Sequence, residues 1–338
     1  MVALLTALAS LCGVLVAGPV SVAESRDEGR TGGATLGRSA PVRTAPSRIT
    51  PVHVTPARAR TAPARAEQRA VAPARTTPDT PPDTPAARRP VGAPAVEAPK
   101  RRVFQGWAFD RCQAPPVSTM RAWSASPYRG VGVYFGGRGR HCRTQKYLDK
   151  GWVREVTKLG WNVLPVYVGS QSPCVIAKMK RKYTIGDNAW AQGRAEARDA
   201  VASAGRLGMV RGSALYLDME AYHHRRYRCG RTTLAFVRSW SREVRQQGYV
   251  PGFYSSANSG VRHMEQSRKA GEPDLPEVMW FARWNVPPSL YGEKWLDRQA
   301  WHPHRRIHQY AGDVVEEHGG RRLAIDRNRV DAPVAVVR

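Results

Sequence analysis

Short apolar runs recur along the chain from residue 104 onward, each bounded by glycine, proline or serine. They are rich in Val, Tyr, Phe and Trp, which is typical of β-strands. Most are too apolar to have one face in water, so they predict a parallel sheet covered by helices. The predicted strands span residues 106–110, 129–137, 162–170, 213–222, 250–256, 277–284, 306–310 and 322–328.

Apolar residues at helical spacing separate the early strands. This pattern predicts long helices, each followed by a glycine that would end it, over residues 144–159, 187–207 and 232–247. Weaker patterns predict shorter helices over residues 118–126, 259–270 and 288–300.

Strands and helices that alternate over about 235 residues match the size of a (β/α)8 barrel. The link between Tyr310 and Arg322 is too short for a full helix, so the seventh repeat should be reduced. A doubly wound open sheet is the alternative, but no Gly-x-Gly-x-x-Gly phosphate loop follows the first strand. We therefore predict an α/β fold, a TIM-type (β/α)8 barrel over residues 104–338.

Two segments of different composition precede the predicted barrel. Residues 1–23 are apolar and uncharged, and their Ser-Val-Ala end resembles a signal-peptidase site, although a basic start is missing. We expect a cleaved signal peptide rather than a membrane anchor, with the export route left open. Residues 24–103 hold 13 of the 26 prolines and no aromatic residue. This composition predicts a disordered linker.

The chain is strongly basic, with a net charge of +26. Fifteen lysines and arginines against seven acidic residues give residues 24–103 a charge of +8, which leaves +18 for residues 104–338. Such a field favours an anionic partner: a cell-wall polymer, an acidic glycan, a membrane surface or nucleic acid. We expect no nucleic-acid partner, because no basic motif or zinc module accompanies the charge and the protein should be exported.

Four cysteines lie in the predicted barrel: Cys112, Cys142, Cys174 and Cys229. An even number in an exported chain predicts two disulfides, and three connectivities are open. Structural zinc sites usually need Cys-x-x-Cys pairs, which are missing here.

The segment SALYLDMEAY (213–222) places two carboxylates one residue apart. Strand side chains alternate between faces, so Asp218 and Glu220 should share one side. A structural salt bridge with an arginine such as Arg283 is the alternative to a functional pair, but two carboxylates on one face need two partners.

Two further carboxylates join this pair if the fold is a barrel. Reactive groups of such barrels lie at the C-terminal ends of the strands. Asp110 ends the first predicted strand and Asp326 lies near the end of the eighth. The four acids should therefore converge, and like-charge crowding would raise the pKa of at least one of them. Glycosidic bond cleavage needs a carboxylate pair of this kind.

The same alternation directs aromatic side chains toward the barrel interior or its rim. Rings beside carboxylates suit sugar binding, although a single Tyr or Trp in a barrel strand more commonly belongs to the core. The candidate substrate-binding residues are Tyr134, Tyr167, Tyr216, Tyr254, Trp280, Trp284 and Tyr310.

Neither the histidines nor the serines form a recognisable catalytic pattern. His302, His304 and His308 flank the seventh strand and His223 and His224 follow the fourth, without metal-ligand spacing. No Gly-x-Ser-x-Gly elbow is present. We expect no metal and no cofactor.

Several segments together resemble the glycoside-hydrolase-like barrel domain of secreted actinobacterial proteins, which is related to the family 25 lysozymes. They include GWAFDRCQAPP, GWNVLPVYVGSQ, LYLDMEAY, GYVPGFYSSANSG and HQYAG followed by AIDRN. The resemblance covers about residues 105–334. It implies a (β/α)8-type barrel that acts on the peptidoglycan glycan chain.

The resemblance also implies roles for the acids. Asp110 matches the first-strand Asp of the lysozymes, Asp218 and Glu220 match their Asp-x-Glu pair with Glu as the acid, and Asp326 matches their last-strand Asp. The cysteines and the charge of +18 depart from the lysozymes. Pairing each cysteine with its nearest neighbour along the chain gives Cys112–Cys142 and Cys174–Cys229, which would cross-link the loops of the active face.

Two functions follow as hypotheses. The first is a secreted, monomeric glycoside hydrolase that cleaves a cell-wall polysaccharide such as peptidoglycan. Glu220 would protonate the leaving oxygen, and Asp218 would stabilise positive charge on the sugar or orient an acetamido group. Asp110 and Asp326 would position the substrate and tune the pKa values. The second is a non-catalytic wall-binding or remodelling factor that retains the barrel cleft.

Overall fold

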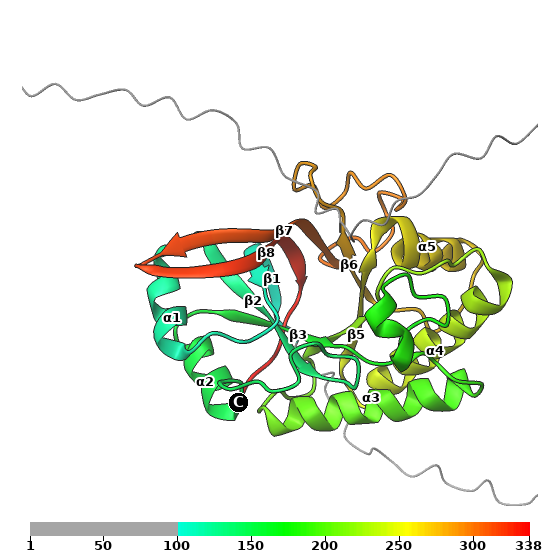
Figure 1. Ribbon diagram of the computed structural model, residues 1–338, viewed down its shortest axis with the longest axis horizontal. Helices are drawn as coiled ribbons and strands as arrows, with labels where there is room; N and C mark the ends of the chain where they lie inside the picture. Colours follow the sequence, from blue (N-terminus) through cyan, green and yellow to red (C-terminus); the bar gives the residue numbers. More distant parts are fainter. Residues whose placement is uncertain (1–100) are drawn as a thin grey trace, which may run out of the picture. The chain divides into compact units, whose positions relative to one another are not determined.

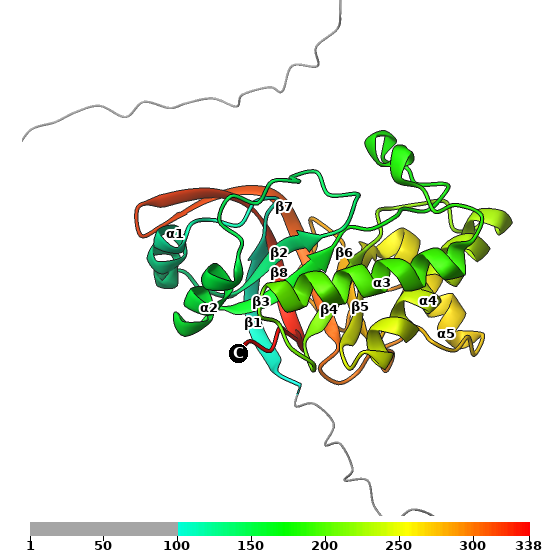
Figure 2. The same ribbon diagram turned by 90° about the horizontal axis from the view of Figure 1, so that it is seen from below.

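The computed structural model describes residues 101–338. The predicted signal peptide and nearly all of the predicted linker lie outside these residues. The described part forms a closed barrel whose eight strands follow one another in chain order (Figures 1 and 2). The strands are β1 (Val103–Asp110), β2 (Tyr128–Gly136), β3 (Asn162–Tyr167), β4 (Ala214–Asp218), β5 (Val250–Ser256), β6 (Val278–Ala282), β7 (Arg306–His318) and β8 (Arg321–Pro333).

The last strand runs against both of its neighbours. Strands β1 to β7 pair in parallel, whereas β8 is antiparallel to β7 and to β1. The prediction of eight parallel βα repeats is therefore wrong at this seam. A parallel connection needs about a dozen residues or more, and only Gly319 and Gly320 join β7 to β8. Their φ angles of 57° and 68° suit a tight hairpin turn.

The helices cover the barrel unevenly. Helices α1 (Val117–Ala122) and α2 (Lys150–Lys158) lie on one side, and α3 (Ala189–Arg206), α4 (Tyr227–Gln246) and α5 (Arg262–Lys269) lie on the other (Figure 1). Helix α2 starts later than predicted, at Lys150, and the side chain of its N-cap residue Asp149 accepts a hydrogen bond from the Trp152 N–H. Two 3-10 segments (Trp123–Ala125 and Lys178–Tyr183) and a π-helical turn (Ala257–Val261) complete the elements.

The predicted helix over residues 288–300 does not form. The segment between β6 and β7 consists of turns and irregular backbone. Its carbonyl groups serve another partner, because the buried guanidinium of Arg306 donates to the carbonyls of Leu290, Asp297 and Ala300. Pro287 and Pro288 lie at the start of this stretch and supply no backbone N–H. The sixth repeat therefore lacks an α-helix, as the seventh does.

Alternation along the strands divides the apolar side chains into two cores. One core fills the barrel interior and includes Leu164, Tyr216 and Trp280. The other lies between the strands and the helices and includes Leu217 and Phe236. A side chain of a strand therefore belongs either to the interior or to the helical layer, and a shift by one residue exchanges the two.

Two disulfides join neighbouring segments around the barrel. Cys112 pairs with Cys142, and Cys174 pairs with Cys229, which is the expected pairing. Cys229 lies in the first turn of α4 rather than in a loop, because this helix begins at Tyr227, earlier than predicted. None of the helices formed by residues 101–338 is long and apolar enough to cross a lipid bilayer.

Candidate active site

A cavity of about 510 Å³ opens at the end of the barrel where the parallel strands terminate. The four predicted carboxylic acids line it: Asp110, Asp218, Glu220 and Asp326. The structure thus brings together side chains that are up to 216 positions apart in the sequence.

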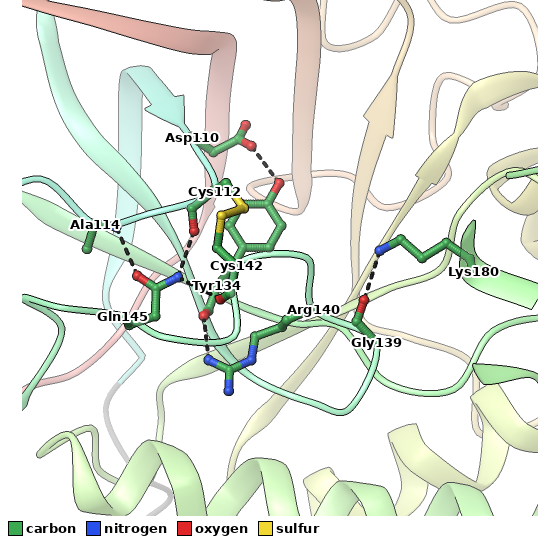
Figure 3. The surroundings of a disulfide bond; sticks show 9 residues. All are labelled: Asp110, Cys112, Ala114, Tyr134, Gly139, Arg140, Cys142, Gln145 and Lys180. Atoms are coloured by element: carbon green, nitrogen blue, oxygen red, sulfur yellow. Dashed lines mark hydrogen bonds between the residues drawn. A yellow bond between two sulfur atoms is a disulfide. The ribbon is translucent and has the colours of Figure 1, made fainter. Parts of the chain in front are cut away.

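Asp110, the last residue of β1, is buried and fully hydrogen-bonded. The side-chain amides of Asn328 and Gln309 donate to its Oδ2, at 2.8 and 3.0 Å. The hydroxyl of Tyr134 donates to its Oδ1 at 2.8 Å (Figure 3). The indole of Trp280 in turn donates to Asn328 Oδ1 and fixes the orientation of that amide. Asp110 is therefore held rigidly by strands β2, β7 and β8.

Asp218 and Glu220 follow one another on the cavity side of β4, as alternation predicts. Asp218 ends the strand and is only 3% exposed. Its Oδ1 is buried and has no hydrogen-bond partner among residues 101–338. The buried Gln171 holds the backbone here, because its amide donates to the Asp218 carbonyl and accepts from the Glu220 N–H. Glu220 itself lies two residues past the strand and is partly exposed.

Asp326 reaches the cavity by a route that differs from the predicted one. It lies in the middle of β8, and because β8 is antiparallel, the C-terminal end of this strand lies at the opposite end of the barrel from the cavity. The rule that reactive groups lie at the C-terminal ends of strands therefore does not explain the position of Asp326. Antiparallel pairing instead sets Asp326 directly opposite Asp110. The backbone N–H of Asp313 donates to its Oδ1 at 2.8 Å. The β7–β8 hairpin therefore supplies one wall of the cavity.

Burial and mutual repulsion disturb the protonation of these acids. Burial raises the pKa of Asp110, although its three hydrogen bonds oppose the rise. Burial also raises the pKa of Asp218 well above its ordinary value, and the charge of Glu220 adds to the effect. Burial and then the charge of Asp110 raise the pKa of Asp326 to about 7. Since these shifts favour protonated acids, the cavity carries less negative charge than four carboxylates would give it.

Cationic side chains share the cavity with the acids. Lys180 is buried, and its Nζ lies 3.4 Å from Glu220 Oε1 while it donates to the Gly139 carbonyl at 3.1 Å. Arg111 and Arg140 also line the cavity. Arg283, the alternative partner of the acids, pairs with Glu293 instead. Among the described residues, Lys180 is therefore the one cation that forms an ion pair with Asp218 or Glu220.

Three of the seven candidate aromatic residues line the cavity: Tyr134, Tyr254 and Trp284. The Tyr254 hydroxyl and the Trp284 indole both donate to Oε1 of Gln309, at 2.9 and 3.0 Å. Trp284 is 44% exposed and offers a ring surface to solvent. This arrangement surrounds the acids with ring faces and edges that a sugar could contact.

The other four aromatic residues lie elsewhere. Tyr216 and Trp280 fill the barrel interior and do not line the cavity. Tyr167 and Tyr310 were expected to face the barrel interior or its rim, but both lie on the outer side of the strands. Tyr167 belongs to the core beneath the helices, and its hydroxyl donates to Asp199 of α3. Tyr310 follows Gln309, which points inward, and so it faces outward and packs on Trp107 with ring centroids 5.8 Å apart.

Among residues 101–338, His141 is the one histidine that lines this cavity. His308 stacks on Phe281 outside the barrel, and His304 pairs with Asp331. His224 stacks on His263, with ring centroids 5.6 Å apart. The histidines singled out in the sequence are therefore scattered over the fold.

Sequence reasoning missed the polar residues that hold the acids in place. Gln309, Asn328 and Gln171 are completely or almost completely buried and bond to the acids or their backbone. All three lie inside the segments that carry the family resemblance (HQYAG, AIDRN and YVGSQ). The signal that could have found them is an amide side chain in an otherwise apolar strand. Lys180 lies outside these segments and gave no such signal.

A family model matches residues 121–330, which is more than half of the chain. It describes the Rv2525c-like, glycoside hydrolase-like domain. The chain belongs to this family. The match includes Asp218, Glu220 and Asp326, whereas Asp110 precedes it. A comparison with curated protein sequences finds no match.

Several solved structures are similar to this member of the family. The Tat-secreted protein Rv2525c from Mycobacterium tuberculosis, crystallised with L-tartrate, has 16% identity and a TM-score of 0.47, over 67% of this chain and 96% of that one. A muramidase from Acremonium alcalophilum has 14% identity and a TM-score of 0.43, over 68% and 94%. A family 25 glycosyl hydrolase from Bacillus anthracis has 12% and 0.40, over 67% and 89%. The family assignment rests on the family model.

Proposed function

We propose that this protein is a secreted glycoside hydrolase that cleaves a polysaccharide of the cell wall, such as peptidoglycan, with the Asp218–Glu220 pair. The observation that carries the proposal is the convergence of four carboxylic acids in one open cavity. Raised pKa values within such a cluster allow one acid to hold a proton near neutral pH while another is ionised. Membership of a glycoside hydrolase-like family supports the same chemistry.

Within the pair, Asp218 is the acid whose surroundings favour the protonated form. The pKa of Asp218 is raised well above its ordinary value by burial, whereas Glu220 forms an ion pair with Lys180. For Glu220 to act as the acid, this proton passes to it when a glycan covers the cavity. Glu220 then protonates the glycosidic oxygen as the C–O bond breaks, and the ionised Asp218 stabilises the positive charge on the sugar. A water molecule adds to that sugar carbon and gives up a proton to the carboxylate pair, which restores the starting state.

In this step Asp110 and Asp326 do not transfer a proton to or from the sugar. Asp110 is fixed by three hydrogen bonds. Asp326 lies directly opposite it in the antiparallel register of β1 and β8. In the proposal, the charge of Asp110 helps to raise the pKa of Asp218, and both acids contact the sugar at the floor of the cavity. Secretion is part of the same proposal, and the two disulfides support it because they persist in oxidising compartments.

Activity on purified cell wall tests the proposal. We expect wild-type protein to lower the turbidity of wall suspensions and to release reducing ends, and Glu220→Gln and Asp218→Asn to lose at least about a hundredfold in rate. Glu155→Gln, on the exposed face of α2, is the matched control and should keep full activity. If folded wild type and Glu220→Gln are equally inactive on a broad panel of glycans, the protein is not a glycoside hydrolase.

A second candidate is a non-catalytic factor that binds wall glycans in the same cavity. The ion pair between Lys180 and Glu220 favours it. A carboxylate held by a lysine can still accept hydrogen bonds from sugar hydroxyls, whereas it would have to leave that ion pair before it could act as an acid. In this case Asp218→Asn/Glu220→Gln should change the affinity for wall material while wild type releases no reducing ends. Unchanged affinity in that double variant would exclude the cavity acids from binding.

A further inference from the structure

Two loops beside the cavity form a surface with positive charge only. Residues 137–148 follow β2 and residues 170–186 follow β3, and neither segment contains Asp or Glu. We call their lysines and arginines the basic surface: Arg138, Arg140, Arg143, Lys146, Lys178, Lys180, Arg181 and Lys182. These 29 residues hold eight of the 38 lysines and arginines of residues 104–338 and none of their 20 acids, although Asp149 and Asp187 directly follow the two segments.

The two loops are fixed to one another. Lys180 donates to the Gly139 carbonyl, as Figure 3 shows. Arg138 donates to the Thr184 carbonyl at 3.0 Å, and Arg143 donates to the Tyr183 hydroxyl at 2.5 Å. The Cys112–Cys142 disulfide ties the first loop to the end of β1 (Figure 3). The cations therefore occupy a defined surface rather than independent loops.

Most of this charge has no partner within the fold. Among residues 101–338, the ion pairs of the basic surface are Arg138 with Glu196 at 3.8 Å and Lys180 with Glu220 at 3.4 Å. The remaining six cations form none in the described part of the chain. Five of them are exposed. Unneutralised cations held close together repel one another, and an anionic partner would relieve this repulsion.

The basic surface is continuous with the cavity. Arg140 and Lys180 belong to both, and Met179 lines the cavity while 62% of it is exposed. Inside the cavity, Arg111 carries a buried Nε without a hydrogen-bond partner in the described residues. A polymer chain that leaves the cavity on this side would cross exposed cations and the half-exposed ring of Tyr147. Sugar rings with acidic substituents match this combination of charge and ring faces.

We propose that the glycan bound by this protein is an acidic polysaccharide, with carboxylate or phosphate groups along the chain, and that the basic surface binds the strand where it leaves the cavity. The proposal rests on the proposed function for the sugar in the cavity, and it narrows the substrate to a charged polymer. Phosphodiester and carboxylate groups share the chemistry that lysine and arginine recognise.

Binding by matched variants of the full chain tests this proposal. Lys146→Gln/Arg181→Gln/Lys182→Gln removes three exposed cations from the basic surface. Arg194→Gln/Arg298→Gln/Arg305→Gln removes three exposed arginines elsewhere and gives the same net charge. The probes are polygalacturonate, a glycerol-phosphate teichoic acid, uncharged dextran and duplex DNA. We expect wild type to bind at least one acidic polysaccharide, more weakly at high salt.

The first triple variant should bind that polymer about tenfold more weakly, from three contacts of about 0.5 kcal/mol each, and the second should match wild type. The polygalacturonate and teichoic-acid arms separate carboxylate from phosphate recognition. Equal losses in both variants, or DNA bound as tightly as the polysaccharides, would overturn the proposal. Released reducing ends are measured separately, so binding without hydrolysis would contradict the proposed function alone. Hydrolysis by wild type, with no loss of affinity for the acidic polymer in the first triple variant, would contradict this inference alone.

Discussion

At the scale of the residue, burial controls the chemistry of the cavity more than the number of charges does. Asp110 and Asp326 face one another across paired strands, and both are shifted toward the protonated form. Asp110 is surrounded by donors, whereas Asp218 Oδ1 has none among the described residues. The same side-chain type thus takes different protonation behaviour from its surroundings.

Asp326 should make the folded protein less stable as the pH rises. Its pKa is about 7 in the folded state and near 3.8 when unfolded, so the folded state binds more protons between these values. Stability then falls from about pH 4 to about pH 7 through this group. Asp326→Asn removes that part of the slope, and its Tm should fall less than that of wild type between pH 5 and pH 8.

Calorimetry over this pH range checks the prediction, with Asp187→Asn as the control at an exposed site. Asp110 and Asp218 stay in both variants, so a residual slope of the same sign should persist. A Tm that falls equally in Asp326→Asn and in wild type would contradict the raised pKa.

The sequence identified the four acids but not the reasons for their positions. Alternation correctly predicted that Asp218 and Glu220 share a face, because it depends only on local backbone geometry. Gln171, Gln309 and Lys180 depend on contacts between distant segments. No local pattern encodes such contacts, so the partners of these residues could not be found in advance, although the two glutamines stand out as amides in otherwise apolar segments.

At the scale of the element, the β7–β8 hairpin is the feature that departs most from the predicted barrel. A short link was noticed in the sequence, but the Gly319–Gly320 pair was not taken as a hairpin turn. Each strand continues beyond the barrel, so that Val314 pairs with Ile325 and His318 with Arg321. This hairpin supplies one wall of the cavity, with Asp313, Ile325 and Asp326 among its residues. If β8 were parallel to β7, the middle of β8 would not be brought to the cavity by a short turn.

Substitution at Gly320 tests the turn. Its φ of 68° favours glycine or asparagine, and no atom lies within 4 Å of an added Cβ. Gly320→Asn should therefore leave the free energy of unfolding nearly unchanged, whereas Gly320→Val should lower it by about 1–2 kcal/mol. Chemical denaturation of both variants measures the difference. Equal stability of the two would mean that the turn does not require the left-handed conformation.

The element boundaries also limited the prediction for the aromatic residues. Tyr134 and Tyr254 follow the expected alternation and line the cavity. At Tyr310 the register shifts between Gln309 and Ala311, and for Tyr167 the strand was assigned the opposite phase. Because side chains change face at every residue, a phase error of one position reverses the prediction.

At the scale of the whole molecule, the disulfides act on stability as well as on the cavity. They close loops between residues 30 and 55 positions apart. Chain entropy then predicts that Cys112→Ser/Cys142→Ser lowers the free energy of unfolding by about 3 kcal/mol. Thermal unfolding of the double variant, beside the wild type with and without reductant, measures this loss. A Tm equal to that of oxidised wild type would show that this disulfide does not stabilise the fold.

The barrel itself could be predicted because apolar strands and amphipathic helices leave strong local signals. The unequal helical cover and the antiparallel seam could not, since both depend on how distant segments meet. The charge of +18 on residues 104–338 was visible in the composition. Its concentration on the two loops beside the cavity became clear only when the fold placed those loops together.

The seam between β1 and β8 also governs the order in which the molecule can assemble. Asp110 and Asn328 are 218 positions apart, and Asp110 and Gln309 are 199 apart. Contacts between such distant segments form late in folding, because closing the long loop between them is unfavourable until other structure exists. A nascent chain that has not yet delivered residue 328 therefore leaves Asp110 without its donors. We therefore expect the cavity with its four acids to be complete only once β8 has paired with β1.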